Sequence, residues 1–141
     1  MESFETERIM RWTLGVLLLS ALLVLSTSAV AEAKTYRANM VIAPTGWCMI
    51  KAGGGIGCSS PAIPAMTDGY AWIRKQGRTH LGDTGNLISP VSSELPSNPP
   101  QLRRGDRWNK RGVRCRVIPG GIKCSNGKHG FRLKKRGYRV W

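Results

Sequence analysis

The chain has 141 residues, with 22 Lys and Arg against 8 Asp and Glu for a formal net charge of +14, and it contains four cysteines and two histidines. Carboxylates this scarce argue against an acid–base catalytic pair. Serine-nucleophile motifs, metal-binding histidine pairs and phosphate-cradling loops are absent from the sequence. We therefore expect a non-enzymatic protein without a cofactor or a bound metal.

A secretory signal peptide is predicted over residues 1–33. Arg11 precedes an apolar run of 12 residues, 14–25, which is too short to cross a bilayer and is followed by small residues. Cleavage is expected after Ala31 or Ala33, at either of two small-x-small sites. The first nine residues are acidic, which is unusual for a signal peptide, and a translation start at Met10 is an alternative. An uncleaved membrane anchor is disfavoured because anchors do not end in small residues, so we expect a secreted or periplasmic protein with no membrane span after cleavage.

Removal of this leader raises the charge density of what remains. It takes away two basic and four acidic residues. The remaining 108 residues contain 20 Lys and Arg and 4 Asp and Glu, a net charge of +16. Leu, Ile, Val and Phe number 19 of these 108, below the roughly 20% at which a highly charged chain tends toward disorder. A core this thin needs further stabilisation, and the cysteines are the obvious source.

The four cysteines lie in two similar segments about 67 residues apart, 48–59 and 115–125. Each segment runs from a cysteine through a short β-prone stretch and a glycine-rich bend to Gly-Ile-x-Cys-Ser. Period-2 alternation predicts two hairpins that are stapled by the disulfides Cys48–Cys58 and Cys115–Cys124. A zinc site is the alternative, but nine and eight intervening residues are far from the two to four typical of zinc ligand pairs.

The same registers align the branched aliphatic side chains. They place Ile50 opposite Ile56 in the first hairpin and Val117 opposite Ile122 in the second. We expect the turn around Pro119 to be longer than two residues or bulged, because an L-Pro-Gly pair twists poorly for a two-residue hairpin.

The rest of the chain contains only short β-prone runs, at residues 36–42, 70–73, 130–134 and 138–141. Residues 81–101 are rich in Gly, Ser, Pro and Asn and are predicted to be a loop or linker between two similar halves. No stretch shows a long apolar stripe of helical period. The predicted fold is therefore a single all-β domain, residues 34–141, built from two pseudo-repeated, disulfide-stapled hairpins.

Several different short motifs follow one another along this chain. They are a Pro-x-Gly before the first cysteine, Gly-Asp-Thr at 82–84, Gly-x-x-Trp at 105–108, a second Cys…Gly-x-x-Cys pair, His-Gly-Phe at 129–131 and Tyr-Arg at 138–139. In these the chain resembles a bacterial family of small secreted disulfide-containing proteins that is catalogued as a domain of unknown function. The resemblance covers most of residues 34–141, although some relatives have a further cysteine pair that this chain lacks. It implies export and a disulfide-bonded β fold, and it implies no activity.

Basic side chains with interleaved aromatics predict electrostatic contact with anionic envelope or extracellular polymers, such as nucleic acid, lipopolysaccharide, teichoic acid or sulfated glycans. Arg114, Arg116 and Lys123 are expected to project from one face of the second hairpin. The predicted binding residues are Arg104, Arg107, Trp108, Lys110, Arg111, Arg114, Arg116, Lys123, Lys134, Lys135, Arg136 and Arg139.

Two alternatives remain open at this point. A secreted ribonuclease-like enzyme could use His80 and His129 as base and acid. A membrane-active cationic defence protein is the other, because a stapled cationic hairpin resembles antimicrobial peptides in design.

Overall fold

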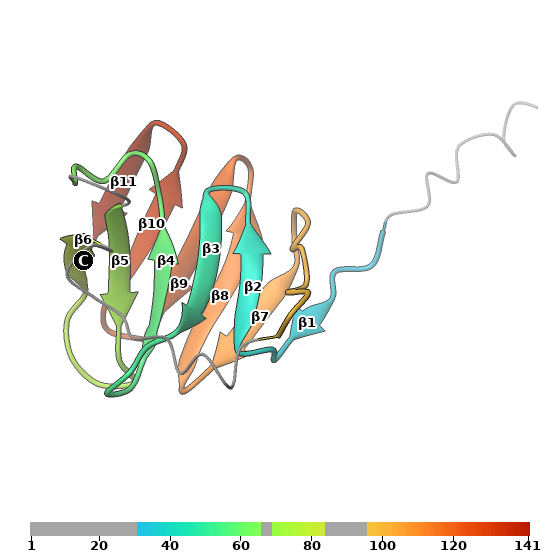
Figure 1. The fold of residues 1–141 in the computed structure, drawn as a ribbon, viewed down its shortest axis with the longest axis horizontal. Helices are drawn as coiled ribbons and strands as arrows, with labels where there is room; N and C mark the ends of the chain where they lie inside the picture. Colours follow the sequence, from blue (N-terminus) through green and yellow to red (C-terminus); the bar gives the residue numbers. More distant parts are fainter. Residues whose placement is uncertain (1–30, 66–68, 84–95) are drawn as a thin grey trace, which may run out of the picture. The chain divides into compact units, whose positions relative to one another are not determined.

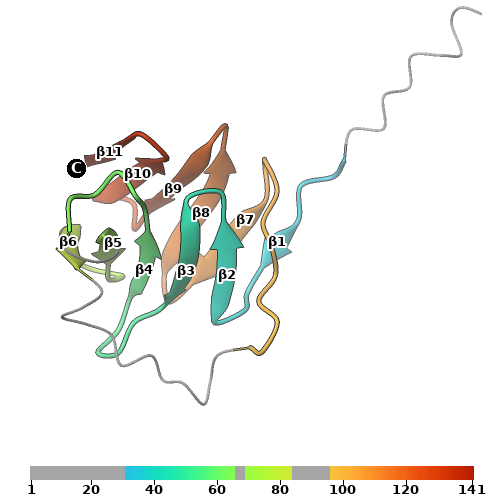
Figure 2. The same cartoon turned by 45° about the horizontal axis from the view of Figure 1, so that its top comes forward.

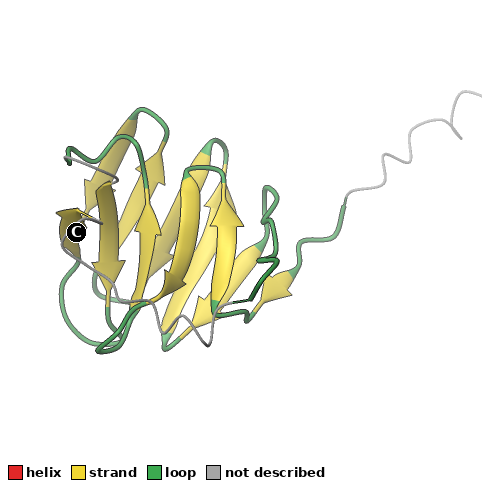
Figure 3. Ribbon diagram, in the orientation of Figure 1, coloured by secondary structure: helices red, strands yellow, loops and turns green. Residues whose placement is uncertain are grey.

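The computed structural model describes residues 31–65, 69–83 and 96–141, and every regular element in them is a β-strand. Figure 3 shows these residues as strands and connecting loops. The strands are β1 (Thr35–Tyr36), β2 (Met40–Ala43), β3 (Gly46–Ile50), β4 (Ile56–Ser59), β5 (Gly69–Ile73), β6 (His80–Asp83), β7 (Arg107–Lys110), β8 (Val113–Ile118), β9 (Gly121–Ser125), β10 (Gly130–Lys134) and β11 (Gly137–Val140). The all-β prediction is confirmed.

The strands form two sheets, each of which is mainly one antiparallel meander. The five-stranded sheet has the order β2-β3-β4-β5-β6, and the six-stranded sheet has the order β1-β7-β8-β9-β10-β11. Among the eleven described strands, β1 and β7 are the one pair that runs in parallel. Figures 1 and 2 show the two sheets as facing layers, with β2 to β6 in front of β7 to β11.

The run predicted at residues 36–42 is two strands in two different sheets. β1 pairs with β7, whereas β2 pairs with β3. The intervening residues 37–39 carry the chain from one layer to the other, so the loose alternation of this run does not belong to one strand.

Both predicted hairpins are confirmed, together with their disulfides and registers. In the β3–β4 hairpin Cys48 is bonded to Cys58 and Ile50 pairs with Ile56. In the β8–β9 hairpin the bonded pair is Cys115–Cys124, and the next pair on the same face is that of Val117 and Ile122. The two stapled hairpins therefore belong to different sheets, one in each layer.

The expectation of a longer or bulged turn at Pro119 is wrong. Ile118 pairs directly with Gly121, which leaves Pro119 and Gly120 as a two-residue turn. Gly120 has φ of +69°. A proline at the first central position and a positive-φ glycine at the second fit a type II turn, so this sequence can close the hairpin tightly.

The core lies between the two sheets and is made by the inward-facing alternate residues of both. Its largest fully buried side chains include Trp108, Phe131, Ile50 and Ile73. The indole N–H of Trp108 donates to the carbonyl of Ala38 at 2.8 Å, so its polar atom is satisfied inside the core.

The ends of the predicted linker 81–101 are part of the fold. Residues 81–83 belong to β6, and residues 84–95 lie outside the described residues. At the other end Gln101 forms a parallel bridge with Ile42, and the buried Leu102 donates its N–H to the Ile42 carbonyl. This stretch therefore adds to the edge of the five-stranded sheet after β2.

The strands all belong to one compact unit, Ala33–Trp141. Residues 1–30, which include most of the predicted signal peptide, lie outside the described residues. In the described residues there is no helix that is long and apolar enough to span a membrane. The two disulfides are consistent with an extracellular or periplasmic protein, since such bonds persist in oxidising compartments.

Candidate binding surface

Strand alternation sorts apolar and cationic side chains onto opposite faces of the six-stranded sheet. Along β8 the residues alternate between buried and exposed positions, with Val113, Cys115 and Val117 inside and Arg114 and Arg116 outside. β9 and β10 follow the same rule, so that Lys123 and Arg132 are exposed between buried neighbours. The prediction that Arg114, Arg116 and Lys123 share one face is confirmed.

The registers place five of these cations in one line across the sheet. Arg107 pairs with Arg116, and Arg116 pairs with Lys123. Lys123 in turn pairs with Arg132, and Arg132 pairs with Arg139. We call this line, one residue on each strand from β7 to β11, the cationic row. With strands about 4.8 Å apart, the row is roughly 19 Å long.

The cationic row has no acidic partner in the described part of the chain. Asp106, the nearest carboxylate in sequence, is 4% exposed and accepts N–H groups of Lys34 and Arg103 through its two oxygens, at 2.9 and 2.8 Å. Like charges directly opposite each other on a sheet are destabilising. Repulsion along the row therefore lowers the stability of the folded state, so a stabilising role does not explain why these cations are there.

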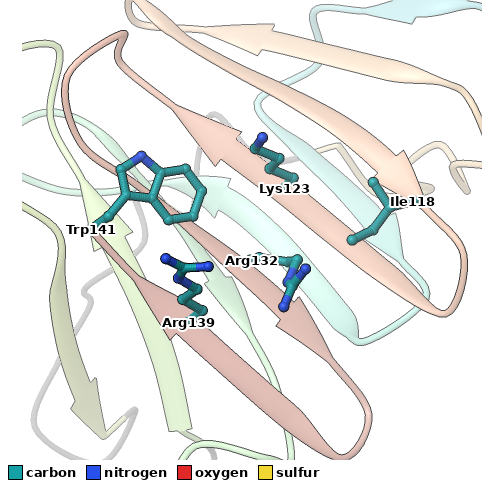
Figure 4. Close-up of a pocket in the computed structure, with 5 residues that line it drawn as sticks. All are labelled: Ile118, Lys123, Arg132, Arg139 and Trp141. Atoms are coloured by element: carbon teal, nitrogen blue, oxygen red, sulfur yellow. The ribbon is translucent and has the colours of Figure 1, made fainter.

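Two shallow hollows lie along the row. One of about 320 Å³ is lined by side chains of β7, β8 and β9, among them Arg107, Arg114 and Arg116. The other, of about 420 Å³, is lined by Ile118, Lys123, Arg132, Arg139 and Trp141. Figure 4 shows Trp141 and Ile118 on opposite sides of the second hollow, with the three cations between them.

Trp108 is not part of this surface, and its assignment as a binding residue is wrong. It follows Arg107 in β7, so alternation turns its side chain inward, and it is completely buried. The aromatic side chain exposed beside the row is that of Trp141, which is 39% exposed. The N–H and carbonyl of Trp141 both bond to Gly130, each at 3.0 Å.

Other predicted binding residues lie away from the row. Lys110 and Arg111 sit at the β7–β8 turn, where their side chains donate to the carbonyls of Arg37 and Lys51, both at 2.8 Å. Arg104 is in the turn before β7, and Lys135 and Arg136 form the turn between β10 and β11. Lys134 is exposed at the end of β10, on the face of the row.

Arg132 is the row member that sequence reasoning left out of the binding set. Its signal was the alternation of β10, Gly130–Lys134, in which Arg132 lies between two buried residues. Its place in the row depends on the β9–β10 register, which the sequence analysis did not assign.

The two histidines make structural contacts. The ring of His80 stacks on Trp72 with centroids 4.2 Å apart, on the five-stranded sheet. The backbone of His129 closes the turn before β10: its N–H donates to Asn126 Oδ1, and its carbonyl accepts from Ser125 Oγ. Nothing in these contacts favours the ribonuclease alternative. In the described residues there is no group of three side chains suited to hold a metal.

Comparison with protein-family models, with curated proteins and with solved structures finds no match for this chain. The resemblance to the bacterial family of small secreted proteins therefore stays a prediction, and the site has to be interpreted from its own geometry.

Proposed function

We propose that this chain is an exported, non-enzymatic protein that binds anionic polymers of the cell envelope or extracellular space through the outer face of its six-stranded sheet. The observation that carries the proposal is the cationic row, in which five adjacent strands each contribute one exposed cation in direct register. A linear polyanion laid across the strands could contact all five at once.

The arrangement of charge, more than its amount, supports this function. Solubility requires a net charge of magnitude about 2–8 for a small domain and is served by scattered charges of both signs. Here five of the cations stand in one line on one face, with no acidic side chain of the described residues beside them. Binding of a polyanion would remove the repulsion along the row, so the ligand would stabilise the sheet that binds it.

Export fits both the ligand class and the covalent structure. The two disulfides are of the kind that forms and persists in an oxidising compartment, and the predicted signal peptide would deliver the chain there.

The proposal is tested by salt-titrated binding of the disulfide-bonded protein to heparin, lipopolysaccharide and linear polyphosphate. Five contacts should give a slope of log K against log salt of roughly −3.5, at about 0.7 per neutralised charge. The triple variant Arg116→Gln, Lys123→Gln, Arg132→Gln should flatten the slope to roughly −1.4. It should also weaken low-salt binding by roughly 10- to 100-fold, from about 0.5–1 kcal/mol per exposed contact.

A matched control carries the same loss of charge elsewhere. Lys75, Arg78 and Lys128 are exposed and lie in loops outside the row, and their replacement by Gln should leave the slope within experimental error. Equal slopes for the two triple variants would show that net charge alone drives binding. Absence of binding to every polymer at low salt would refute the proposal.

A further inference from the structure

We infer that the ligand of the cationic row is an acidic polysaccharide, one sugar ring of which packs against Trp141 at the end of the row. This inference rests on the proposed function and makes it narrower. It names the polymer as a glycan with sulfate, carboxylate or phosphate groups on its rings.

The hollow beside Trp141 has the mixed chemistry that such a ring needs. Ile118 and Trp141 supply apolar walls on its two sides, and Lys123, Arg132 and Arg139 lie between them (Figure 4). A sugar ring has apolar C–H faces and charged substituents around its edge. It could therefore place a face on the indole while its substituents reach the cations.

Trp141 is held in position for this contact. It pairs with Gly130 through two backbone hydrogen bonds of 3.0 Å, and its indole occupies the space that a side chain at Gly130 would fill. The ammonium of Lys123 lies 5.5 Å from the ring centroid, within the range of a cation–π contact. The indole thus lies against the sheet and remains 39% exposed.

The rest of the row continues the line from this hollow. Arg116 and Arg107 follow Lys123 on the next two strands, one cation per strand. A polymer anchored by one ring at Trp141 would therefore run across the strands toward β7, with further anionic groups facing these two arginines.

A nucleic acid fits this face less well. Proteins that bind single strands without sequence preference stack successive bases on several aromatic side chains. From β7 to Trp141, the described aromatics other than Trp141 are Trp108, Phe131 and Tyr138, and their registers turn all three toward the other face. One stacking position with a line of cations suits a polymer whose charges, more than its rings, make most of the contacts.

The experiment compares three ligands of similar length by calorimetry: a heparin-derived octasaccharide, linear polyphosphate, which has no rings, and oligothymidylate. Trp141→Ala should weaken octasaccharide binding by roughly tenfold, the effect of losing one stacked ring, and change polyphosphate binding less than twofold. Trp141→Phe should keep most of the octasaccharide affinity. The matched control is Tyr138→Ala, also on β11 and 42% exposed but on the other face of the sheet, and it should leave both affinities unchanged.

The outcomes separate the two proposals. If the row triple variant weakens all ligands but Trp141→Ala affects the octasaccharide and polyphosphate alike, the row binds polyanions and the glycan inference is wrong. A larger loss for oligothymidylate than for the octasaccharide would assign the ring contact to a base and also overturn it. If no ligand binds the unaltered protein, the proposed function fails, and the glycan inference fails with it.

A second inference rests on a separate contact at the start of the fold. The backbone N–H of Lys34 donates to Asp106 Oδ1 at 2.9 Å, and the N–H of Arg103 donates to Oδ2 at 2.8 Å. Asp106 is buried, and no described basic side chain pairs with it. A buried carboxylate without a counter-charge is unfavourable. We propose that signal-peptide cleavage after Ala33 supplies that charge as the new α-ammonium group of Lys34.

The chemistry is a simple hydrolysis. A signal peptidase would add one water across the Ala33–Lys34 peptide bond, leaving a carboxylate on Ala33 and an amine on Lys34 that is largely protonated at neutral pH. The present hydrogen bond has a charge only on the Asp106 carboxylate, and cleavage would place a positive charge on the donor as well, so that the contact becomes an ion pair. Cleavage of the signal peptide would thereby stabilise the folded protein.

Intact mass of the exported protein should identify Lys34 as its first residue. In Ala33→Leu the second cleavage site is blocked, so cleavage should fall after Ala31 and leave Lys34 with an amide. This variant should fold with a melting temperature lower by roughly 5 °C. Equal melting temperatures, or an unaltered protein that begins at Glu32, would overturn this second inference.

Discussion

Replacement of Arg116, a member of the row, should both stabilise the fold and weaken the proposed binding. It has a cation directly opposite it on each side, Arg107 on β7 and Lys123 on β9. Arg114 is also exposed on β8, but its opposite residues are the neutral Asn109 and Ser125. The comparison of Arg116→Thr with Arg114→Thr therefore isolates the two like-charge contacts.

The magnitude follows from the register. Cross-strand pairs contribute roughly 0.2–1 kcal/mol each, and two repulsive pairs of that size give a gain of about 1 kcal/mol for Arg116→Thr over Arg114→Thr. Because 1 kcal/mol shifts the melting temperature by roughly 4–8 °C in a domain near 100 residues, the difference should be about 5 °C. Threonine has high β propensity and a short side chain at both positions, so the strand itself should be little affected.

The assay is thermal or urea unfolding of both variants under non-reducing conditions, at low salt and in 1 M NaCl. In 1 M salt the Debye length is about 3 Å, shorter than the strand spacing, so the difference should disappear. An Arg116→Thr variant that is no more stable than Arg114→Thr at low salt would refute the repulsion argument. A stability difference that persists in 1 M salt would assign it to something other than charge.

Three further outcomes follow from the fold. Replacing Cys115 and Cys124 together by Ala should lower the free energy of unfolding by roughly 2–3 kcal/mol, as expected for a loop of about ten residues, and chemical denaturation would measure this. Trp108→Phe should lower the free energy of unfolding by about 2 kcal/mol, because the Ala38 carbonyl loses its indole donor and the core loses volume. Its affinity for polyanions should stay the same. Ser60→Ala should lose about 1 kcal/mol, because the 2% exposed Ser60 hydroxyl donates to the carbonyl of Lys134 in the opposite sheet.

Local alternation was enough to predict the two stapled hairpins. In each, the cysteines and one aliphatic pair lie on a common face, and only one register satisfies both pairs. The exposed face of the second hairpin followed from the same pattern. The assignment of the two hairpins to separate sheets did not follow, because it depends on the connection at residues 37–39 and on packing between layers.

The cationic row needed three registers that the sequence analysis did not assign: β7–β8, β9–β10 and β10–β11. Trp108 was placed on the surface because its neighbours in sequence are basic. Residues 107–110 had not been predicted as a strand, and only strand alternation shows that Trp108 points opposite to Arg107. Proximity of charges in sequence was thus a poor guide, and their register across strands was the informative feature.

The central claim is that a polyanion lies along the row, and amide chemical-shift mapping during titration with a heparin octasaccharide tests it most directly. We expect the largest shifts at Arg107, Arg116, Lys123, Arg132 and Arg139, with smaller changes in the five-stranded sheet. Shifts that concentrate in the cationic loops around Lys75 and Arg111, with the row unaffected, would contradict the account.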